Sequence, residues 1–459
     1  MNRSFWKCKM QLPKLDYTFS FGSIQSQNIQ VTQTNHSMNN ESDGFTITLH
    51  DNTLWINGFS PRASISADLL DLAVAIHAVD RLIERPRDKT LSFHIKIQVR
   101  NLDLFSKNDV GMLLNKILHW YTDDHWHFEF SKQTIGRQEE IQYRFPTEDS
   151  FAENADVVLW SGGLDSLAGL YTQLDNDPES RYILVGTGSN AQVHAKQTEL
   201  AKEMERLFPK RILLQQVPYS WSNTPSPEKN FYARSRGFVF MLIGAAFAHC
   251  VGRNSLFIYE NGIGAMNLPY SRGQSRSDQA ISVHPLSVLY VNELVSTILS
   301  TSFEVLNPFW LYTKAQMVES LNHTKGLELI KLSSSCDRHH RKEGGITQCG
   351  ICTSCLLRRQ SIIAAGIDDP TIYDSFCIPG NGQHLCAMTH QINTLRKLLN
   401  QDDPWLSLSG EYYDLDNIVG SISREDTKKT VYLKEQILQL YSKYKDEWKL
   451  FEEYIERTN

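Results

Sequence analysis

Short, wholly apolar runs that alternate with helical segments from residue 156 onward place the strongest constraint on the fold. The runs are VVLW at 157–160, YILVGTG at 182–188, RILLQQV at 211–217 and SLFIYENG at 255–262. Continuous apolar strands separated by helices are typical of a parallel sheet that is covered on both faces. Residues 151–330 therefore predict an α/β domain with a doubly wound parallel sheet. In such sheets, ligands bind outside the carboxyl ends of the strands.

Residues 1–150 have a different pattern and predict an N-terminal α+β accessory domain. Apolar residues recur at helical spacing from Leu69 to Ile83, and LSFHIKIQV at 91–99 alternates between apolar and polar residues as a half-buried strand does. HWHFEFS at 125–131 and IQYRFP at 141–146 alternate in the same way, and we expect the histidines at 125 and 127 to face solvent. Residues 20–44 are rich in Ser, Asn and Gln, and they predict a loop.

Residues 377–459 predict a helical extension. Two apolar stripes recur at helical spacing, one from Leu385 to Leu399 and one from Leu433 to Phe451. They indicate packing faces rather than chemistry.

The composition is that of an ordinary globular protein, with 41% hydrophobic and 21% charged residues. The formal net charge of -6 argues against a protein whose whole surface binds nucleic acid, although a local basic groove is compatible with it. The N-terminus lacks the apolar core of a signal peptide, and the apolar run FVFMLIGAAFA at 238–248 is too short to span a bilayer. We therefore expect a cytoplasmic protein with no membrane partner, in which residues 238–248 form a buried helix.

The segment WSGGLDS at 160–166 lies where the first apolar run meets a helix. Gly162 and Gly163 permit a backbone nest whose N–H groups bind phosphate at a helix N-terminus. The hydroxyls of Ser161 and Ser166 can donate to phosphate oxygens. Asp165 would repel a phosphate, so we expect it to hold Mg²⁺ or to fix the loop.

Four cysteines cluster in the segment 331–376 with the spacing C-x12-C-x2-C-x2-C. They are Cys336, Cys349, Cys352 and Cys355. Four thiolates at these spacings can close around one Zn²⁺ ion in a structural site, and an iron–sulfur cluster is the main alternative. The adjacent histidines at 339 and 340 are interpreted as surface residues, and the other four cysteines show no partner pattern.

The lysine-free pattern SGGLDS resembles the signature of the ATP-pyrophosphatase, or PP-loop, family. Together with the cysteine spacing, it resembles the 7-cyano-7-deazaguanine synthase (QueC) family within that superfamily. Further similarity lies in CTSCLLR, AAGIDDPT, NPFWLYTKAQMV and YARSRG. Lys314 matches the lysine of the third segment and Arg234 the arginine of the fourth, where Ser235 replaces an asparagine.

The resemblance implies an enzyme that binds ATP with Mg²⁺ and adenylates the carboxylate of 7-carboxy-7-deazaguanine, so that pyrophosphate leaves and an amine can attack. It implies catalytic roles for Asp165, Ser166 and Lys314. The nucleotide-binding residues would be those of the loop, namely Ser161, Gly162, Gly163, Leu164, Asp165 and Ser166.

Two features depart from the compact family and resemble the long QueC-like proteins of bacterial anti-phage defence operons (the QatC type). IGAMNLPYSRGQSRSD at 263–278 carries arginines where the family has acids, and residues 1–150 and 377–459 are additions. The resemblance implies an amine acceptor, which is ammonia or, as these added regions suggest, a larger acceptor such as an amine of a partner protein or of a nucleic acid.

We expect the 7-deazaguanine substrate to bind between the loop at 161–166 and the end of LFIYENG, because neighbouring carboxyl ends of parallel strands face one crevice. Glu260 is expected to accept hydrogen bonds from the N–H edge of the base, and Asn261 to orient it. Arg234 or Lys314 would neutralise charge on the reacting phosphorus. A salt bridge or a helix N-cap is the alternative interpretation of Glu260.

Two other functions compete with adenylation for a deazaguanine. A tRNA-modifying sulfurtransferase would need a relay cysteine near the nucleotide, and Cys250 is the one cysteine of the α/β core outside the cluster. A non-catalytic adaptor is disfavoured because Asp165, both glycines and both serines of the loop are intact.

Overall fold

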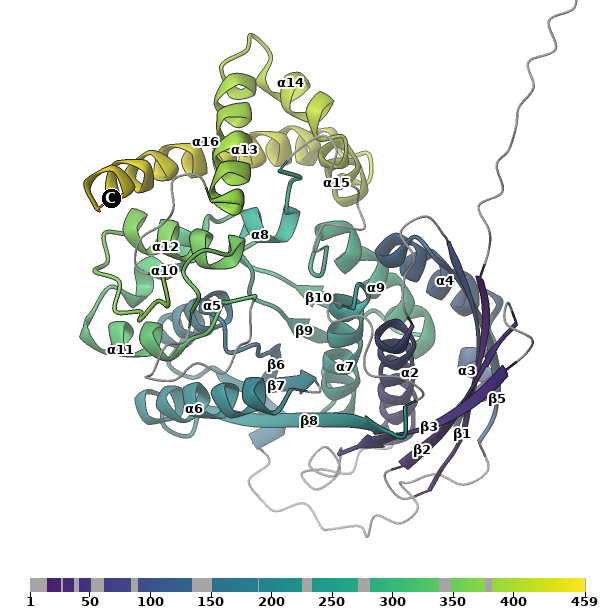
Figure 1. The fold of residues 1–459 in the computed structure, drawn as a ribbon. Coiled ribbons are helices and arrows are strands. Elements are labelled where there is room, and N and C mark those ends of the chain that lie inside the picture. The colour runs from purple at the N-terminus through teal and green to yellow at the C-terminus, as the bar shows by residue number, and fades with distance from the viewer. Residues whose placement is uncertain are drawn as a thin grey trace, which may run out of the picture.

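The computed structural model describes residues 15–25, 28–36, 41–50, 62–83, 90–133, 151–188, 190–224, 233–270, 281–337, 348–375 and 382–458. Ten strands form one sheet in the order β10-β9-β6-β7-β8-β3-β2-β1-β4-β5 (Figure 1). The strands are β1 Leu15–Gln25, β2 Asn28–Asn35, β3 Glu41–Leu49, β4 Leu91–Val99, β5 His125–Lys132, β6 Ala155–Leu159, β7 Arg181–Gly188, β8 Ile212–Ser222, β9 Ser255–Phe257 and β10 Glu304–Leu306.

The half of the sheet from β10 to β8 is parallel throughout and carries helices on both faces. Its elements include η2 Phe151–Asn154, α5 Leu164–Asn176, α6 Ala191–Leu207, α7 Arg236–Cys250, α8 Gly262–Met266, α9 Pro285–Leu299, α10 Lys314–Val318, η4 Glu319–Leu321 and α11 Thr324–Leu332. Val157 faces the core that contains α7 and α9, whereas the next residue, Val158, faces the core that contains α5 and α6. The prediction of a doubly wound parallel sheet is confirmed.

The N-terminal strands continue this sheet. β3 pairs antiparallel with β8, with Ile47 opposite Trp221, and β2, β1, β4 and β5 follow in turn. The helices of this part are α2 Ala63–Leu82, α3 Leu102–Phe105 and α4 Asn108–Thr122. α2 packs against α7, so the N-terminal strands and helices share one core with the parallel half of the sheet (Figure 1).

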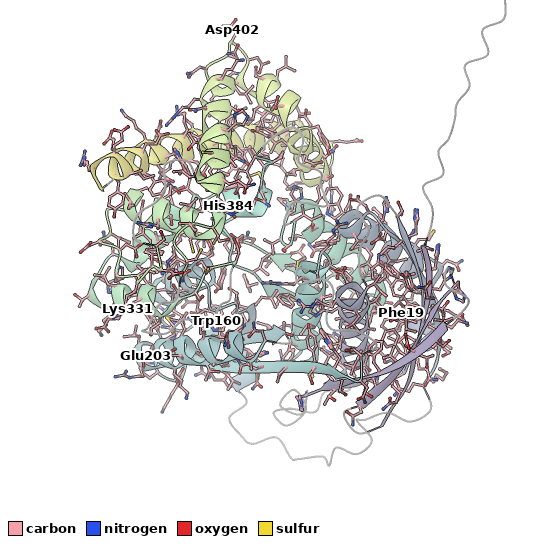
Figure 2. The ribbon with its side chains drawn as sticks, in the orientation of Figure 1. Phe19, Trp160, Glu203, Lys331, His384 and Asp402 are labelled. Atoms are coloured by element: carbon pink, nitrogen blue, oxygen red, sulfur yellow. The ribbon has the colours of Figure 1, made fainter. Side chains whose placement is uncertain are left out.

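The prediction of a loop over residues 20–44 was wrong, because β1, β2 and β3 occupy most of it. Their apolar residues alternate and are buried, as Phe19, Phe21 and Val31 are (Figure 2 labels Phe19). The polar residues between them lie on the other face of the sheet, which the helices leave open. The polar composition therefore reflects one exposed face of the strands. The run at 141–146 lies outside the described residues.

The C-terminal residues form a helical extension, as the two apolar stripes at 385–399 and 433–451 predict. It consists of α13 Gln383–Leu399, α14 Pro404–Glu411, α15 Asp414–Ser423 and α16 Thr427–Thr458, and it packs on α12 Thr353–Ala364 (Figure 1). The two stripes meet in one apolar core, in which Ile392 and Ile437 are fully buried. The domain boundaries at 150, 330 and 376 stay predictions.

The apolar run at 238–248 lies in α7 and is buried, as expected. Among the described residues, none of the helices is both long enough and apolar enough to cross a membrane.

Because the core is shared, we expect the fold to need residues 1–150. A fragment of residues 151–459 would expose the β8 edge and the face of α7 that packs on α2, and a bare apolar face and strand edge favour aggregation. We expect this fragment to be insoluble, or to bind a hydrophobic dye strongly, when the full chain does not. A soluble, monodisperse fragment in size-exclusion chromatography would contradict this expectation.

Candidate functional site

The turn between β6 and α5 is anchored at its start by Trp160, which is buried. The indole Nε1 of Trp160 donates to the carbonyl oxygen of Gln197 at 3.1 Å, and Gln197 Nε2 donates to the carbonyl oxygen of Trp160 at 2.9 Å. This reciprocal pair ties the end of β6 to α6 (Figure 2 labels Trp160). This pair therefore fixes the start of the turn that follows at residues 161–163.

The loop itself is closed by its own serines. Gly162 has a φ of 73°, a left-handed conformation that favours glycine. Ser161 Oγ accepts from the Gly163 N–H at 3.1 Å and lies 3.0 Å from Ser166 Oγ. Ser166 Oγ also donates to the Gly163 carbonyl at 3.0 Å. Leu164 begins α5, so the loop leads directly to a helix N-terminus, where backbone N–H groups and the helix dipole favour an anion.

Three segments distant in the sequence meet at Asp165. Asn261 Nδ2 donates to Asp165 Oδ1 at 2.9 Å, and Lys314 Nζ forms an ion pair with Asp165 Oδ2. The Asp165 and Lys314 side chains are only 13% and 7% exposed. The same Asn261 Nδ2 donates to Glu260 Oε1 at 2.8 Å. The structure thus brings together the loop, the end of the β9 segment and the start of α10.

Glu260 and Asn261 are held by their local structure. Asn261 is the N-cap of α8, because its Oδ1 accepts from the Gly264 N–H at 2.9 Å. Asn307 Nδ2 donates to the Glu260 carbonyl at 2.9 Å, and the Glu260 N–H donates to Asn307 Oδ1 at 3.3 Å. The N-cap of α8 is thus Asn261, and the interpretation of Glu260 as an N-cap was wrong. Sequence reasoning missed Asn307, since an asparagine between two apolar segments carries no pattern of its own.

The electrostatics of the cluster favour a neutral Glu260. Burial, and after it the charge of Asp165, raise the pKa of Glu260 to about 8, while Lys314 acts in the opposite direction. An acid with such a pKa is poised to change its charge when a ligand arrives. N–H donors from a ligand would favour the ionised form.

Lys314 occupies the first position of α10 and is buried. Thr313 caps this helix: its Oγ1 accepts from the Gln316 N–H at 3.2 Å, and Gln316 Oε1 accepts from the Thr313 N–H at 2.9 Å. This capping box fixes the first turn of the helix.

Arg234 lies beside the N-terminal region. Its Nη1 donates to the carbonyl oxygen of Thr122 at the end of α4, at 3.0 Å. The neighbouring Ser235 donates through both its N–H and its hydroxyl to Asp80 Oδ2 on α2, each at 2.7 Å. A direct role for Arg234 at the reacting phosphorus stays a prediction.

The four cysteines converge as their spacing predicts. Cys336, Cys349, Cys352 and Cys355 are at most 4% exposed, and their Sγ atoms lie within 4.8 Å of one another. Backbone N–H groups point at two of the sulfurs, from Cys349 to Cys336 Sγ at 3.4 Å and from Cys352 to Cys349 Sγ at 3.3 Å. Such N–H groups stabilise thiolates, so the set fits a tetrahedral ion such as zinc. The residues at 339 and 340 lie outside the described part of the chain.

The cysteine segment contacts the glycine loop at 161–166 directly. The Ser334 N–H donates to the Gly162 carbonyl at 3.0 Å, and the Leu164 N–H donates to Ser335 Oγ at 3.4 Å. Arg358, which is fully buried, donates to Ser335 Oγ at 3.4 Å and to the Ile330 carbonyl at 2.6 Å. Sequence reasoning quoted Arg358 only as part of CTSCLLR and missed this bridging position.

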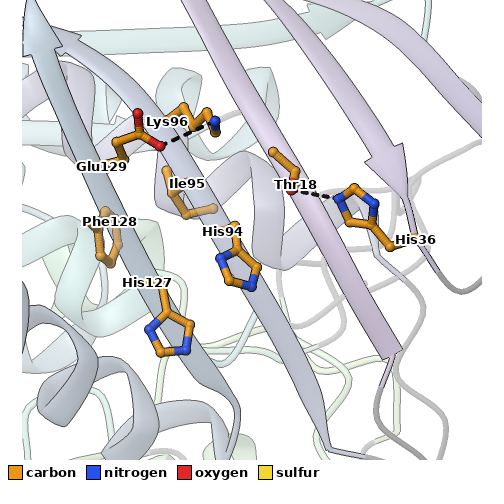
Figure 3. A pocket seen from close by; sticks show the side chains of 8 residues that line it. All are labelled: Thr18, His36, His94, Ile95, Lys96, His127, Phe128 and Glu129. Atoms are coloured by element: carbon orange, nitrogen blue, oxygen red, sulfur yellow. Dashed lines mark hydrogen bonds and ion pairs between the residues drawn. The ribbon is translucent and has the colours of Figure 1, made fainter. Parts of the chain in front are cut away.

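A separate hollow of about 480 Å³ lies on the open face of the N-terminal strands (Figure 3). His94 and His127 stack there with ring centroids 5.1 Å apart, and Thr18 hydrogen-bonds to His36 at 2.8 Å. None of its lining residues belongs to the glycine loop at 161–166 or to the strands from β6 to β10. His127 is exposed, as the alternation of its strand predicts.

Comparison with known proteins shows which proteins the middle of the chain is similar to. Residues 213–366 match the family model described as "Queuosine biosynthesis protein QueC". A 7-cyano-7-deazaguanine synthase of Picrophilus torridus is 27% identical over 239 residues, which is 48% of this chain and 92% of the relative. The middle of this chain is QueC-like. A synthase of the same name from Cellvibrio japonicus is also 27% identical, over 47% of this chain and 96% of the relative.

Both relatives are named for the synthesis of 7-cyano-7-deazaguanine. The relatives are matched over nearly their whole length, whereas about half of this chain takes no part in the alignment. The comparisons therefore say nothing about the role of this other half of the chain.

The cysteine cluster leads to a prediction about metal content. We expect one Zn²⁺ per chain by elemental analysis, and we expect Cys352→Ser to yield poorly folded protein, because metal binding supplies folding free energy to a loop-rich segment. Cys386→Ser, at an exposed cysteine outside the cluster, is the matched control and should fold normally. Iron in place of zinc, or a stable and active zinc-free Cys352→Ser protein, would contradict the structural zinc assignment.

Proposed function

We propose that this QueC-like protein is an ATP-dependent adenylating enzyme that activates the carboxylate of a 7-deazaguanine for attack by an amine. The observation that carries the proposal is the contact of Asp165 with Asn261 and Lys314. Through Asn261, this contact connects the glycine loop at 161–166 to Glu260, a buried acid that can accept hydrogen bonds from a nucleobase. The name of the relatives, 7-cyano-7-deazaguanine synthase, supplies the substrate class.

In the proposed reaction, the loop at 161–166 binds the β- and γ-phosphates of ATP. A substrate carboxylate oxygen attacks the α-phosphorus, the bond between the α-phosphorus and the bridging oxygen breaks, and pyrophosphate leaves with that bonding pair. The amine then attacks the carbonyl carbon of the acyl adenylate, loses a proton and displaces AMP. A carboxylate alone is a poor electrophile, and the AMP ester provides the leaving group.

The proposal assigns distinct roles to the charged residues. Lys314 would neutralise the charge that develops on the phosphorus, acting in a site that largely excludes water. Mg²⁺ would neutralise phosphate charge, and the carboxylate of Asp165 offers the oxygen donor that this ion prefers. In the structure, the ammonium of Lys314 is the counter-charge of Asp165.

We propose a macromolecular amine, of a partner protein or of a nucleic acid, as the acceptor, and anti-phage defence as the setting. The support is the resemblance to the long defence-associated proteins, the arginines in 263–278 and the residues added on both sides of the QueC-like region. Ammonia is the alternative acceptor that the compact relatives suggest. Residues 271–280 lie outside the described residues.

The structure argues against the sulfurtransferase alternative. Cys250 lies in the apolar core beneath the sheet and is 3% exposed. Burial raises the pKa of this thiol to about 12, so it would be neutral and a poor nucleophile.

Product analysis tests the proposed reaction. With ATP and 7-carboxy-7-deazaguanine, we expect AMP and pyrophosphate, and mass spectrometry should detect an adenylated carboxylate. Asp165→Asn should abolish turnover, because it keeps the shape of the side chain but removes the charge opposite Lys314. The asparagine fills the space of the aspartate, but the buried ammonium of Lys314 then loses its counter-charge. ADP and phosphate as products would exclude PP-loop chemistry.

A second measurement tests the base-binding role of Glu260. Glu260→Gln should weaken binding of the deazaguanine carboxylate by about 1.5–3 kcal/mol, the range for hydrogen bonds to a charged group. ATP affinity should stay near the wild-type value, because the loop is unchanged. Isothermal titration with each ligand separates the two effects. Unchanged affinity for the carboxylate would move the base-binding role elsewhere, to the segment from Asn267 to Asp278.

A further inference from the structure

The long C-terminal helix α16 contacts the residue that caps α10. Thr313 Oγ1 donates a hydrogen bond of 2.6 Å to Glu447 Oε1 on α16. The same hydroxyl accepts from the Gln316 N–H. Both Thr313 and Glu447 are buried, at 0% and 7% exposure. Glu447 therefore orients the hydroxyl that caps α10, so that its lone pair faces the first turn of the helix.

The residue after Thr313 is Lys314, whose ammonium pairs with Asp165. The connection from α16 to the loop thus has three steps. Glu447 contacts Thr313, Thr313 is bonded to Lys314, and Lys314 pairs with Asp165 of the loop. The backbone of Lys314 moves with its cap, because Thr313 and Lys314 share a peptide bond and the capping box fixes the first turn.

α16 also contacts the other side of the site. A Cβ atom at Gly262, the residue after Asn261, would lie 2.7 Å from Leu440 Cδ2 of α16 and 2.4 Å from the Trp310 carbonyl oxygen. The Gly262 N–H donates to the Tyr312 carbonyl at 2.8 Å. The start of α8 and the segment that leads to α10 are therefore packed together under α16.

We propose that Glu447 is a positioning residue for Lys314, and that α16 thereby forms part of the reaction site. The inference rests on the proposed function, which gives Lys314 its task. Glu447 lies beyond residue 366, where the QueC match ends, so this contact belongs to the added C-terminal region.

A buried glutamate at position 447 lowers the stability of the folded state, so we infer that it is there to position Lys314. Burial raises the pKa of its carboxyl to about 7, with Glu319 adding to the effect and Thr313, Gln360 and Lys443 opposing it. The unfolded chain ionises this acid near its ordinary pKa, so between these two values the unfolded state binds fewer protons and stability falls as the pH rises. Its Oε2 atom has no hydrogen-bond partner among the described residues. An apolar side chain would avoid these costs.

Substitutions at position 447 test the inference. Glu447→Leu removes the acceptor, and we expect kcat for AMP release to fall about tenfold, equivalent to about 1.4 kcal/mol, with KM for ATP nearly unchanged. Glu447→Gln keeps an oxygen that can accept from Thr313, and it should retain most of the activity. Glu452→Leu is the matched control. Glu452 also lies on α16, but it pairs with Arg396 of α13 at 2.6 Å instead of contacting Thr313.

A double-mutant cycle tests whether Glu447 acts through Lys314. In a Lys314→Met background, Glu447→Leu should have no further effect on the residual rate, because coupled residues are not additive. Independent, multiplicative losses would overturn the inference. The same holds if Glu447→Leu behaves like Glu452→Leu, or if Glu447→Gln is as impaired as Glu447→Leu.

A readout that needs no turnover separates this inference from the proposed function. An amine-acylating reagent, followed by peptide mass spectrometry, should modify Lys314 faster in Glu447→Leu than in the wild type or in Glu452→Leu. If the wild type releases no AMP but shows this difference, the proposed function fails and the positioning contact stands. Equal labelling rates in the three proteins would overturn the positioning role itself.

Discussion

The buried ion pair between Asp165 and Lys314, shared with Asn261, is the interaction on which the rest of the site depends. Neither charge can be removed from water alone without a large cost, so the loop and α10 are stable in this arrangement only together. Asn261 adds the third segment by donating to both Asp165 and Glu260. The site is therefore one electrostatic unit built from three separate parts of the chain.

The surroundings of this unit are fixed by backbone contacts rather than by more charges. Trp160 and Gln197 secure the end of β6, and Asn307 secures the backbone of Glu260. The cysteine segment reaches the loop through Ser334 and Ser335. A metal ion that orders the cysteines would thus also order the glycine loop at 161–166.

The regions added to the QueC-like core are integrated into the same fold. β3 completes the edge of β8, and α2 covers α7, so the N-terminal region buries surfaces that would otherwise be exposed. At the other end, Glu447 of α16 joins the cap of α10. The additions therefore bear on the stability and the geometry of the central site.

The sequence alone determined the features that depend on local pattern. These are the parallel strands, the buried helix α7, the glycine loop and the cysteine spacing, and Lys314 was identified through a family resemblance. Tertiary structure alone decided the rest. The strands within residues 20–44 were missed because Ser, Asn and Gln dominate this segment, and its few alternating apolar residues, such as Ile29 and Val31, did not outweigh that composition. Asn307, Arg358 and Glu447 act through contacts between residues far apart in the sequence, and no local periodicity or spacing reports such contacts.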